Sequence, residues 1–306
     1  MKKRTSLFVM AASTLALFAG APAFAEAKPA AQPAAATAPA PKGPALWKVA
    51  DQDTTIYLFG TVHVLPKDIQ WYDATIAKAF EGSDILVTEI PMDPESEKAM
   101  QQLAVTKGML PAGTTLRSLL NDEQKTQYTA ALAKIGAPAE AFDPLKPWLV
   151  GLTLSLVPLM QSGYDANSGV EKVLLAKAEG KPKGALETAE FQLGIFDGMP
   201  QDAQVTFMIE AATKMDETKP TLDRMVKEWA AGDPDALAAV MNEGMDDPKV
   251  AEALLYNRNA NWADWIKTRL EQPGTVFIAV GAGHLAGPKS VQDYLKAKGI
   301  KTSRVK

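Results

Sequence analysis

The sequence predicts an α/β fold, with a mixed, partly parallel sheet built from two strand-GxxH-helix units and a large helical insertion. Apolar, β-branched runs alternate with stretches of helical spacing, a pattern typical of strands joined by crossover helices. Two of these runs end in the same phrase, glycine-x-x-histidine, at residues 60–63 and 281–284. Most of the chain between the two phrases has helical periodicity, which indicates the insertion.

The N-terminus has the features of a secretory signal peptide. Three basic residues at 2–4 precede an apolar run over 7–19, and Ala23-Phe24-Ala25 has the form of a processing site. We expect cleavage after Ala25 and a periplasmic or secreted mature chain. The apolar run is shorter than the roughly 20 residues that span a bilayer, so no transmembrane segment is expected in the mature chain.

Three regions are therefore predicted: a signal peptide at 1–25, a linker at 26–44 and a folded domain at 45–306. The linker is rich in alanine and proline and has almost no bulky apolar residue, a composition that cannot form a core. The remaining length of about 260 residues is enough for one large domain. We place its helical insertion at about 95–270.

The first predicted unit is strand, helix, strand. Residues 54–59 are β-branched and aromatic and end at Gly60, and residues 84–90 form a similar run that Pro91 stops. Between them, residues 68–80 have apolar side chains at helical spacing. The helix is predicted to end at Gly82.

The second unit has the same order near the C-terminus. A continuous apolar run at 275–280 predicts a buried strand, followed by a helix at 290–298 and a short strand at 301–305. A further strand is predicted at 182–186, after a helix at 167–179. Parallel strands of this kind gather ligands at their carboxyl ends.

The insertion is predicted to be helical almost throughout. Its apolar spacing and glycine stops indicate helices at 122–135, 146–161, 201–215, 221–231 and 234–242. The most apolar stretch, 148–160, contains Pro158 and is too short to cross a bilayer, which favours a buried core helix. A long helix at 247–272 opens with Asp247 as N-cap and Pro248 in its first turn.

Four polar residues lie at the carboxyl ends of the predicted strands: His63, Glu89, Glu187 and His284. Neutral imidazoles and carboxylates are suitable ligands for zinc, manganese, cobalt or iron, with a position left for water. One GxxH phrase alone is a weak signal, because a histidine after a strand often caps a turn. Two copies that contain every histidine of the chain predict one shared site.

The glycines of these phrases have a predicted role as well. A chain that turns at a strand end and brings its backbone close to a ligand favours residues without a Cβ atom. Gly60, Gly281 and Gly283 meet that description. We expect them to form the backbone turns beside the substrate.

Arg258 is placed by helical geometry. In the 247–272 helix it lies within a stripe of core-facing apolar residues, and Asn259 lies at the edge of that stripe. A buried arginine requires an anionic partner. It can clamp a site carboxylate or stabilise a developing oxyanion, or it can form a structural salt bridge that holds the helix to the sheet.

Composition excludes several functional classes. The chain has no cysteine, so a disulfide framework, a thiol nucleophile and thiolate metal ligands are excluded. Its formal net charge is −4, which disfavours a general nucleic-acid-binding role. Oxygen and imidazole groups are the ligands that remain.

Several of these phrases together resemble the TraB/GumN family, which includes Tiki-type membrane proteases and pheromone-shutdown proteins and is distantly similar to erythromycin esterases. The phrases are Leu46-Trp47, residues 57–63, Glu89, Lys146-Pro147-Trp148, residues 169–177, Leu186-Glu187-Thr188 with Gln192, residues 256–259 and residues 281–285. The resemblance covers most of the mature chain. It implies an α/β fold with a helical insertion.

The resemblance also implies a metal-dependent hydrolase site built from the two GxxH histidines and glutamate. Arg258 and Asn259 match the family's arginine-asparagine pair on a helix. Glu171 departs from the pattern, because an aspartate is more usual there and glutamate reaches farther. The resemblance therefore assigns no role to Glu171.

The leading hypothesis is a metal-dependent hydrolase, a peptidase acting on a peptide or protein. His63, His284 and Glu187 would hold manganese, cobalt or zinc, Glu89 would act as ligand or general base, and Arg258 would stabilise charge on the substrate carbonyl. One alternative is a metal-free, esterase-like hydrolase in which a histidine tuned by Glu89 activates water. The other is a non-catalytic protein that sequesters a peptide or haem, with a histidine as axial ligand or contact.

Overall fold

The structure is a computed structural model that describes residues 43–243 and 248–306. The predicted signal peptide and nearly all of the predicted linker lie outside the described residues, as does the predicted N-cap Asp247. No described helix combines the length and the apolar character needed to cross a membrane.

The centre of the fold is a six-stranded sheet with the order β6-β4-β7-β2-β1-β8. Strands β6, β4, β7 and β2 run parallel, whereas β1 and β8 are antiparallel to their neighbours. The bounds are Leu46–Ala50 (β1), Thr54–Thr61 (β2), Ile85–Thr88 (β4), Lys183–Ala185 (β6), Gly274–Gly281 (β7) and Thr302–Arg304 (β8). The predicted mixed, partly parallel sheet is confirmed.

Strands β2 and β7 are the longest and form the middle of the sheet. Their parallel register pairs Thr54 with Gly274 at one end and Thr61 with Gly281 at the other. Six consecutive residues of β7 are buried, because helices cover both faces of the sheet. The two strands end side by side, so the two GxxH phrases begin at the same level.

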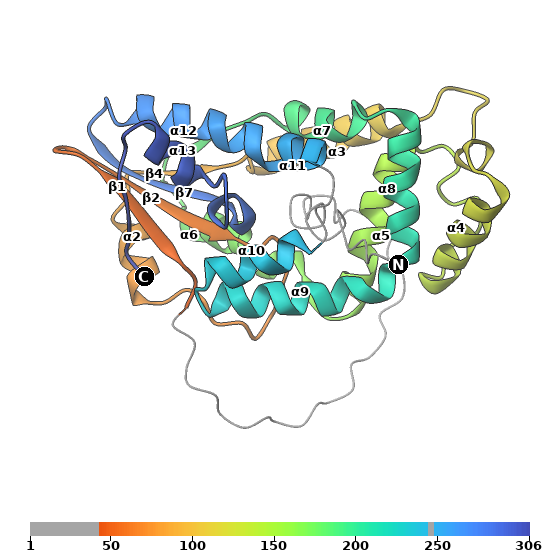
Figure 1. The fold of residues 1–306 in the computed structure, drawn as a ribbon, viewed down its shortest axis with the longest axis horizontal. Coiled ribbons are helices and arrows are strands. Elements are labelled where there is room, and N and C mark those ends of the chain that lie inside the picture. Colours follow the sequence, from red (N-terminus) through yellow and green to blue (C-terminus); the bar gives the residue numbers. More distant parts are fainter. Residues whose placement is uncertain (1–42, 244–247) are drawn as a thin grey trace, which may run out of the picture.

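Four helices cover the two faces of the sheet (Figure 1). They are α2 (Ala74–Glu81), α6 (Val170–Lys177), α12 (Asn257–Arg269) and α13 (Val291–Ala297). Phe277 of β7 packs in one core with residues of α2 and α6. Ile278 packs in another core with residues of α12 and α13. This alternation follows from the period of two along a strand.

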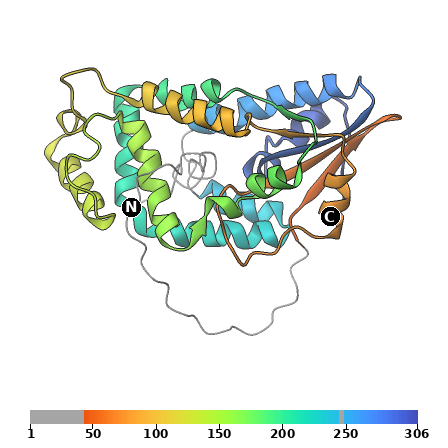
Figure 2. The same cartoon turned by 180° about the vertical axis from the view of Figure 1, so that it is seen from behind.

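The inserted region is mainly helical. Much of it extends away from the sheet (Figures 1 and 2), but residues 222–229 and 237–241 share a core with β2 and β7. It contains α3 (Pro94–Gly108), α4 (Asp122–Lys134), α5 (Pro147–Gln161), α7 (Ala189–Asp197), α8 (Gln201–Thr213), α9 (Met215–Ala230), α10 (Pro234–Asn242) and α11 (Pro248–Ala251). Helices α4, α5 and α8 share a third core at the far end. The insertion also supplies β6 to the main sheet and β5 (Tyr164–Asp165), which pairs with β3 (Leu65–Pro66).

Some predicted boundaries were wrong. The helix predicted at 68–80 begins only at Ala74, because Asp73 accepts hydrogen bonds from the first-turn N–H groups and acts as N-cap. Helix α9 begins at Met215 and continues through Pro220, well before the predicted start at 221. The helix predicted at 167–179 is a 3₁₀ turn (Ala166–Ser168) followed by α6.

The predicted helix at 247–272 is helical but not uniform. A π-helical segment, Glu252–Tyr256, separates α11 from α12. Such segments are rare and are frequent at functional sites. Here the π segment comes directly before Arg258 and Asn259, both of which are fully buried.

Candidate functional site

The carboxyl ends of β2, β4, β6 and β7 bring the predicted polar residues to one edge of the sheet. His63 follows β2, Glu89 follows β4 and Glu187 follows β6. His284 lies in a 3₁₀ turn, Ala282–Leu285, directly after β7. Arg258 of α12 approaches the same edge and contacts three of these side chains.

Arg258 is the hub of the site. Its Nη2 atom donates to Glu89 Oε2 at 2.5 Å and Glu187 Oε2 at 2.9 Å, and its Nε atom donates to both oxygens of Glu187. Its Nη1 atom lies 3.0 Å from the Leu254 carbonyl oxygen and 3.1 Å from His284 Nε2. A guanidinium has five N–H donors, and these contacts use all of them. Arg258 therefore has no donor left for a substrate oxyanion.

Glu187 is held from three sides. Besides Arg258, it accepts hydrogen bonds from the Trp262 indole at 2.9 Å and from Gln192 Nε2 at 3.2 Å. Gln192 also donates to Glu89 Oε2 at 2.9 Å, so one amide bridges both carboxylates. Because its lone pairs face protein donors, Glu187 acts here as a counter-ion for Arg258.

Glu89 is buried and ionised. Its Oε1 atom accepts the Gly281 N–H at 2.7 Å. Burial alone would raise the pKa of Glu89, but the positive charge of Arg258, together with the two histidines and the Gly281 N–H, outweighs burial and lowers the pKa to about 2. Glu89 and Arg258 therefore form a buried ion pair at every ordinary pH.

His284 is a neutral imidazole with a defined tautomer. Arg258 can only donate, so His284 Nε2 must accept, and His284 Nδ1 then carries the proton toward Asn259 Oδ1 at 2.6 Å. Burial, and then the positive charge of Arg258, lower the pKa of His284 to about 3. The ring also packs on Trp262, with centroids 4.2 Å apart.

Asn259 orients His284. Its Nδ2 atom donates to the carbonyl oxygen of Lys289 at 2.8 Å, which turns Oδ1 toward the imidazole. Lys289 has a left-handed backbone, with φ of 58°, and is the one non-glycine residue among those described that has a positive φ. Asn259, predicted at the edge of the helix stripe, is fully buried.

His63 has a different partner, Glu171. The His63 Nδ1 atom lies 2.7 Å from Glu171 Oε1, and the Thr61 hydroxyl donates to the same oxygen. Burial disfavours the charged imidazolium, but the adjacent carboxylate outweighs this effect and the pKa of His63 is raised. Glu89 contributes to the same shift, which places His63 within electrostatic reach of the Arg258 cluster.

Two atoms of this pair have no hydrogen-bond partner among the described residues. They are His63 Nε2 and Glu171 Oε2, and both are buried. Buried polar atoms are nearly always paired, because an unpaired one costs free energy. The His63–Glu171 pair therefore retains an imidazole lone pair and a carboxylate oxygen for chemistry.

Gly169 allows this pair to form. It precedes α6, and a Cβ atom on it would overlap the backbone carbonyl oxygen of His63. The Val170 N–H donates to the Val62 carbonyl at 3.0 Å, so the loop after β2 packs directly on the start of α6. Glu171 lies in the first turn of that helix, beside His63.

The GxxH glycines are required for close approach, and none of the three has a positive φ. A Cβ atom on Gly60 would lie 3.0 Å from Ala282 Cα, and one on Gly281 would lie 3.1 Å from Glu89 Oε1. A Cβ on Gly283 would overlap the flexible end of Met241. The turn itself does not demand glycine. The packing leaves little room for a side chain at Gly60 and Gly281, whereas at Gly283 the flexible end of Met241 can move.

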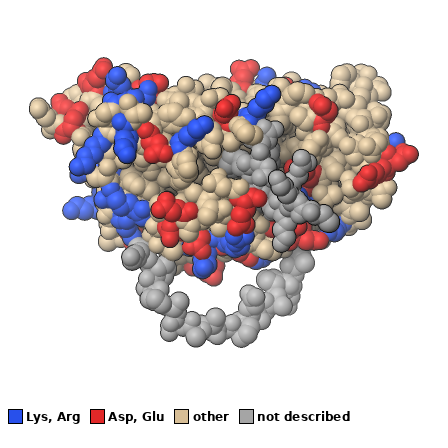
Figure 3. All heavy atoms as spheres, viewed as in Figure 1, with Lys and Arg blue, Asp and Glu red and all other residues tan. Residues whose placement is uncertain are grey.

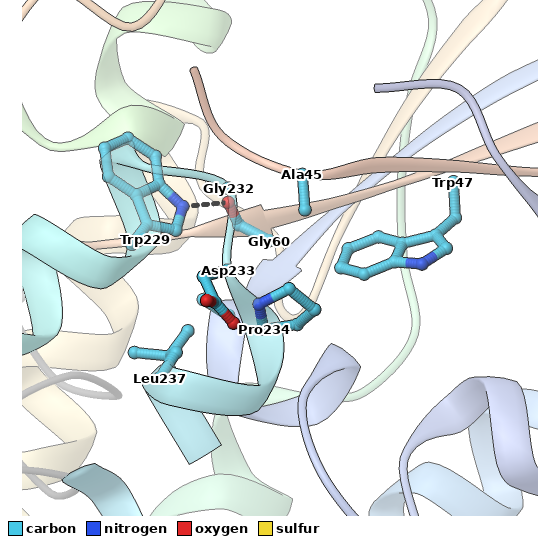
Figure 4. A pocket seen from close by; sticks show the side chains of 9 residues that line it. Ala45, Trp47, Gly60, Trp229, Gly232, Asp233, Pro234 and Leu237 are labelled. Carbon is cyan, nitrogen blue, oxygen red and sulfur yellow. Dashed lines mark hydrogen bonds between the residues drawn. The ribbon is translucent and has the colours of Figure 1, made fainter. Parts of the chain in front are cut away.

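A small pocket lies behind the Gly60 turn (Figure 4). It measures about 10 Å³, which is room for one water-sized molecule. The Trp229 indole donates to the Gly60 carbonyl oxygen at 2.8 Å beside it. The lining residues are Ala45, Trp47, Gly60, Trp229, Gly232, Asp233, Pro234, Leu237 and Ala282.

The predicted metal ligands do not fit a divalent cation in this arrangement. The Arg258 guanidinium contacts Glu89, Glu187 and His284 and takes the lone pairs that a metal would need. Within 43–243 and 248–306, no group of three or more His, Cys, Asp or Glu side chains is placed to hold a metal ion. Metal binding stays a prediction.

Sequence reasoning missed Glu171, Thr61 and Gln192 as members of the site. Glu171 starts a helix far along the chain from His63, and only the packing of Gly169 on the His63 loop brings them together. The signal available was the Gly169-Val170-Glu171 phrase at the helix start. The phrase is part of the family resemblance, but glutamate in place of the more usual aspartate leaves Glu171 without a role implied by that resemblance.

Comparisons with known proteins identify relatives of this chain. An uncharacterized protein of Treponema pallidum (strain Nichols) is 22% identical over 270 residues, which cover 82% of this chain and 80% of that protein. Uncharacterized protein YbaP of Escherichia coli (strain K12) is 23% identical over 242 residues, covering 78% and 87%, and YbaP of Shigella flexneri matches equally. No solved structure matches the chain significantly. The profile of the TraB/PrgY/gumN family matches residues 45–304, and the chain therefore belongs to this family.

Proposed function

We propose that this protein is a hydrolase in which His63 acts as general base toward water. The observation that carries the proposal is the His63–Glu171 pair, with Nδ1 2.7 Å from the carboxylate and Nε2 buried without a partner. A histidine whose second nitrogen is held by a carboxylate is a common general base. The raised pKa of His63 strengthens its basicity.

The reaction begins with proton transfer from water to His63 Nε2, while the water oxygen forms a bond to the substrate carbonyl carbon. The Nδ1–H bond to Glu171 stabilises the imidazolium that results. The same proton then passes to the leaving group as its bond to the carbonyl carbon breaks. A peptide amide or an ester is a suitable substrate, because both undergo this acyl transfer.

The Arg258 cluster has a supporting role in this proposal. Its donors are all taken by protein acceptors, so it fixes Glu89 and Glu187 rather than contacting the reacting carbonyl. The ionised Glu89 carboxylate in turn favours the imidazolium form of His63. Arg258 is thus a positioning residue.

The test is hydrolysis of peptide libraries and activated esters by the purified chain. Glu171→Gln should lower kcat by about a hundredfold or more while leaving KM largely unchanged, because the carboxylate acts on the transition state. Glu179→Gln, at an exposed glutamate after the same helix, is the matched control. Hydrolysis that is unaffected by both His63→Gln and Glu171→Gln would refute the proposal.

A metal-dependent hydrolase is the second candidate, and one observation favours it. His63 Nε2 and Glu171 Oε2 have no hydrogen-bond partner among the described residues, and an imidazole nitrogen and a carboxylate oxygen are ligand atoms that manganese, cobalt and zinc bind. This version requires Arg258 to withdraw from Glu89, Glu187 and His284.

Elemental analysis of chain purified without chelator or histidine tag separates the two versions. The metal-free hydrolase predicts activity that survives chelation and no stoichiometric metal. A metal that is present in the wild type and lost in both His63→Ala and His284→Ala would favour the second candidate.

We also propose a periplasmic or secreted location, on the basis of the N-terminal sequence. Processing after Ala25 would leave Glu26 as the first residue of the mature chain. N-terminal sequencing of the protein from the native host would test this directly. Exported protein that still begins at Met1 would contradict the proposal.

A further inference from the structure

An open groove lies away from the proposed catalytic site, between the end of α13 and the start of β8. Its volume is about 410 Å³. Gln292, Asp293 and Lys296 line it from α13, and Gly299 and Lys301 line it from the turn into β8. A Cβ atom on Gly299 would meet nothing within 4 Å, so this side of the groove is open.

The groove lies in the most basic part of the chain. After Asp293 the sequence contains five basic side chains and no acidic one, although the whole chain has a net charge of −4. In Figure 3, Lys and Arg gather at the end of the molecule that holds β1, β8 and α13. This charge separation favours an anionic partner at the groove.

Two of these five basic side chains flank the groove, have no ion pair within the described residues and can contact a ligand. Lys298 pairs with Asp264 at 2.5 Å, and Lys306 pairs with Asp73. For Lys296 and Lys301, which flank the groove, the described part of the chain contains no ion pair. Asp293, which also lines the groove, accepts the Lys289 N–H at 2.9 Å.

A buried acceptor lies beside the two lysines. Gln292 Nε2 donates to the Leu285 carbonyl oxygen at 2.9 Å, which holds the amide in place. Gln292 Oε1 is buried and has no partner among the described residues. A ligand that pairs with all three groups therefore carries negative charge for the two lysines and an O–H or N–H donor for Gln292 Oε1.

We propose that this groove binds a phosphate ester whose carrier bears a hydroxyl or ammonium group. Lys296 and Lys301 contact the phosphate oxygens, and the carrier's donor hydrogen-bonds to Gln292 Oε1. Glycerol phosphate has this chemistry, both as a free molecule and as a phospholipid headgroup. The proposed site is independent of the hydrolytic activity.

Isothermal titration of the chain with glycerol phosphate tests the site, with sulfate as an anion that has no donor. The wild type should bind glycerol phosphate more tightly than sulfate. Lys296→Gln/Lys301→Gln should weaken both by about tenfold, since two ammonium contacts are lost. Lys98→Gln/Lys125→Gln, with the same charge change on α3 and α4, should leave both affinities unchanged.

Gln292→Leu separates the two parts of the site. It should abolish the preference for glycerol phosphate over sulfate while retaining sulfate affinity. Cosedimentation with phosphatidylglycerol and with phosphatidylcholine vesicles distinguishes the sources: retention on the first alone identifies a lipid headgroup, and binding of the soluble ester alone identifies a free ligand. Absence of saturable binding to either, or equal binding by the lysine double variant and wild type, would overturn the proposal.

Discussion

Arg258 decides the chemistry of this site at the scale of single residues. Sequence geometry left three roles open for it: a clamp on a site carboxylate, a donor to an oxyanion, or a structural salt bridge that holds the helix to the sheet. The contacts to Glu89, Glu187, His284 and the Leu254 carbonyl use all its donors, which favours the clamp. In the proposed function, the reactive atoms are the unpartnered ones, on His63 and Glu171.

Arg258→Lys should destabilise the protein by about 3 kcal/mol, although the charge is kept. Lysine has three donors and no planar fork, so buried acceptors on Glu187, Glu89 or His284 would lose partners. Urea unfolding measures the change. Arg224→Lys at the exposed pair with Glu243 is the matched control and should cost less than about 1 kcal/mol. Equal losses of unfolding free energy in the two variants would contradict the role of Arg258 as the shared partner of several buried acceptors.

Most of the candidate residues could be predicted because each belongs to a local pattern. His63, Glu89, Glu187 and His284 end strands, and Arg258 interrupts an apolar helix stripe. Glu171 could not be predicted in this way, since its partner is set by three-dimensional packing and not by spacing. The consequence is that sequence reasoning paired the two histidines with each other, whereas each has its own polar partner.

At the scale of elements, the site depends on where two helices begin. The π segment before α12 precedes Arg258, and its Leu254 carbonyl accepts from the arginine side chain. The start of α6 lies against the His63 loop at Gly169, close enough to exclude a side chain. Helical periodicity predicted both helices, but it contains no signal for a π segment or for this contact.

Gly169→Ala should separate Glu171 from His63. The added methyl overlaps a backbone carbonyl oxygen, so the helix start or the loop must shift, at a cost of about 2 kcal/mol. Gly194→Ala in α7 is the control: its Cβ would meet nothing within 4 Å, so stability should rise or stay constant. Thermal unfolding of both variants measures the difference, and equal melting temperatures would contradict the contact.

At the scale of the whole molecule, the parallel register of β2 and β7 brings together residues from both ends of the chain. Strands β2, β4, β6, β7 and β8 and most helices follow from periodicity and glycine stops. The sheet order does not, because strand pairing depends on contacts between distant segments. Strand β1, the short strands β3 and β5 and helices α3 and α7 were not predicted from the sequence, since few of their residues show a clear apolar period.

Acid should weaken the fold through the buried site. His284 has a folded pKa of about 3, below its ordinary 6.5, so the folded state binds fewer protons than the unfolded state between these values. The stabilisation is present above pH 6.5 and is lost as the pH falls toward 3. Glu89, with a pKa of about 2, adds a further loss below about 4.5.

Urea unfolding across pH 3–8 measures this dependence. The loss from His284 should be on the order of 4 kcal/mol, since one pKa unit corresponds to about 1.4 kcal/mol. His284→Gln should be less stable near neutral pH and should show a flatter pH profile. If the free energy of unfolding of the wild type did not change between pH 6.5 and pH 4, the result would contradict a neutral, buried His284 imidazole.

The central claim is that His63 is the basic, reactive imidazole and that Glu171 makes it so. The chain has only two histidines, so a nitrogen NMR titration of untagged protein resolves both rings. The account predicts one histidine with a pKa above 6.5, which falls in Glu171→Gln, and a second that stays neutral, with its proton on Nδ1, down to about pH 3. Two histidines that both titrate near 6.5, with neither altered by Glu171→Gln, would contradict it.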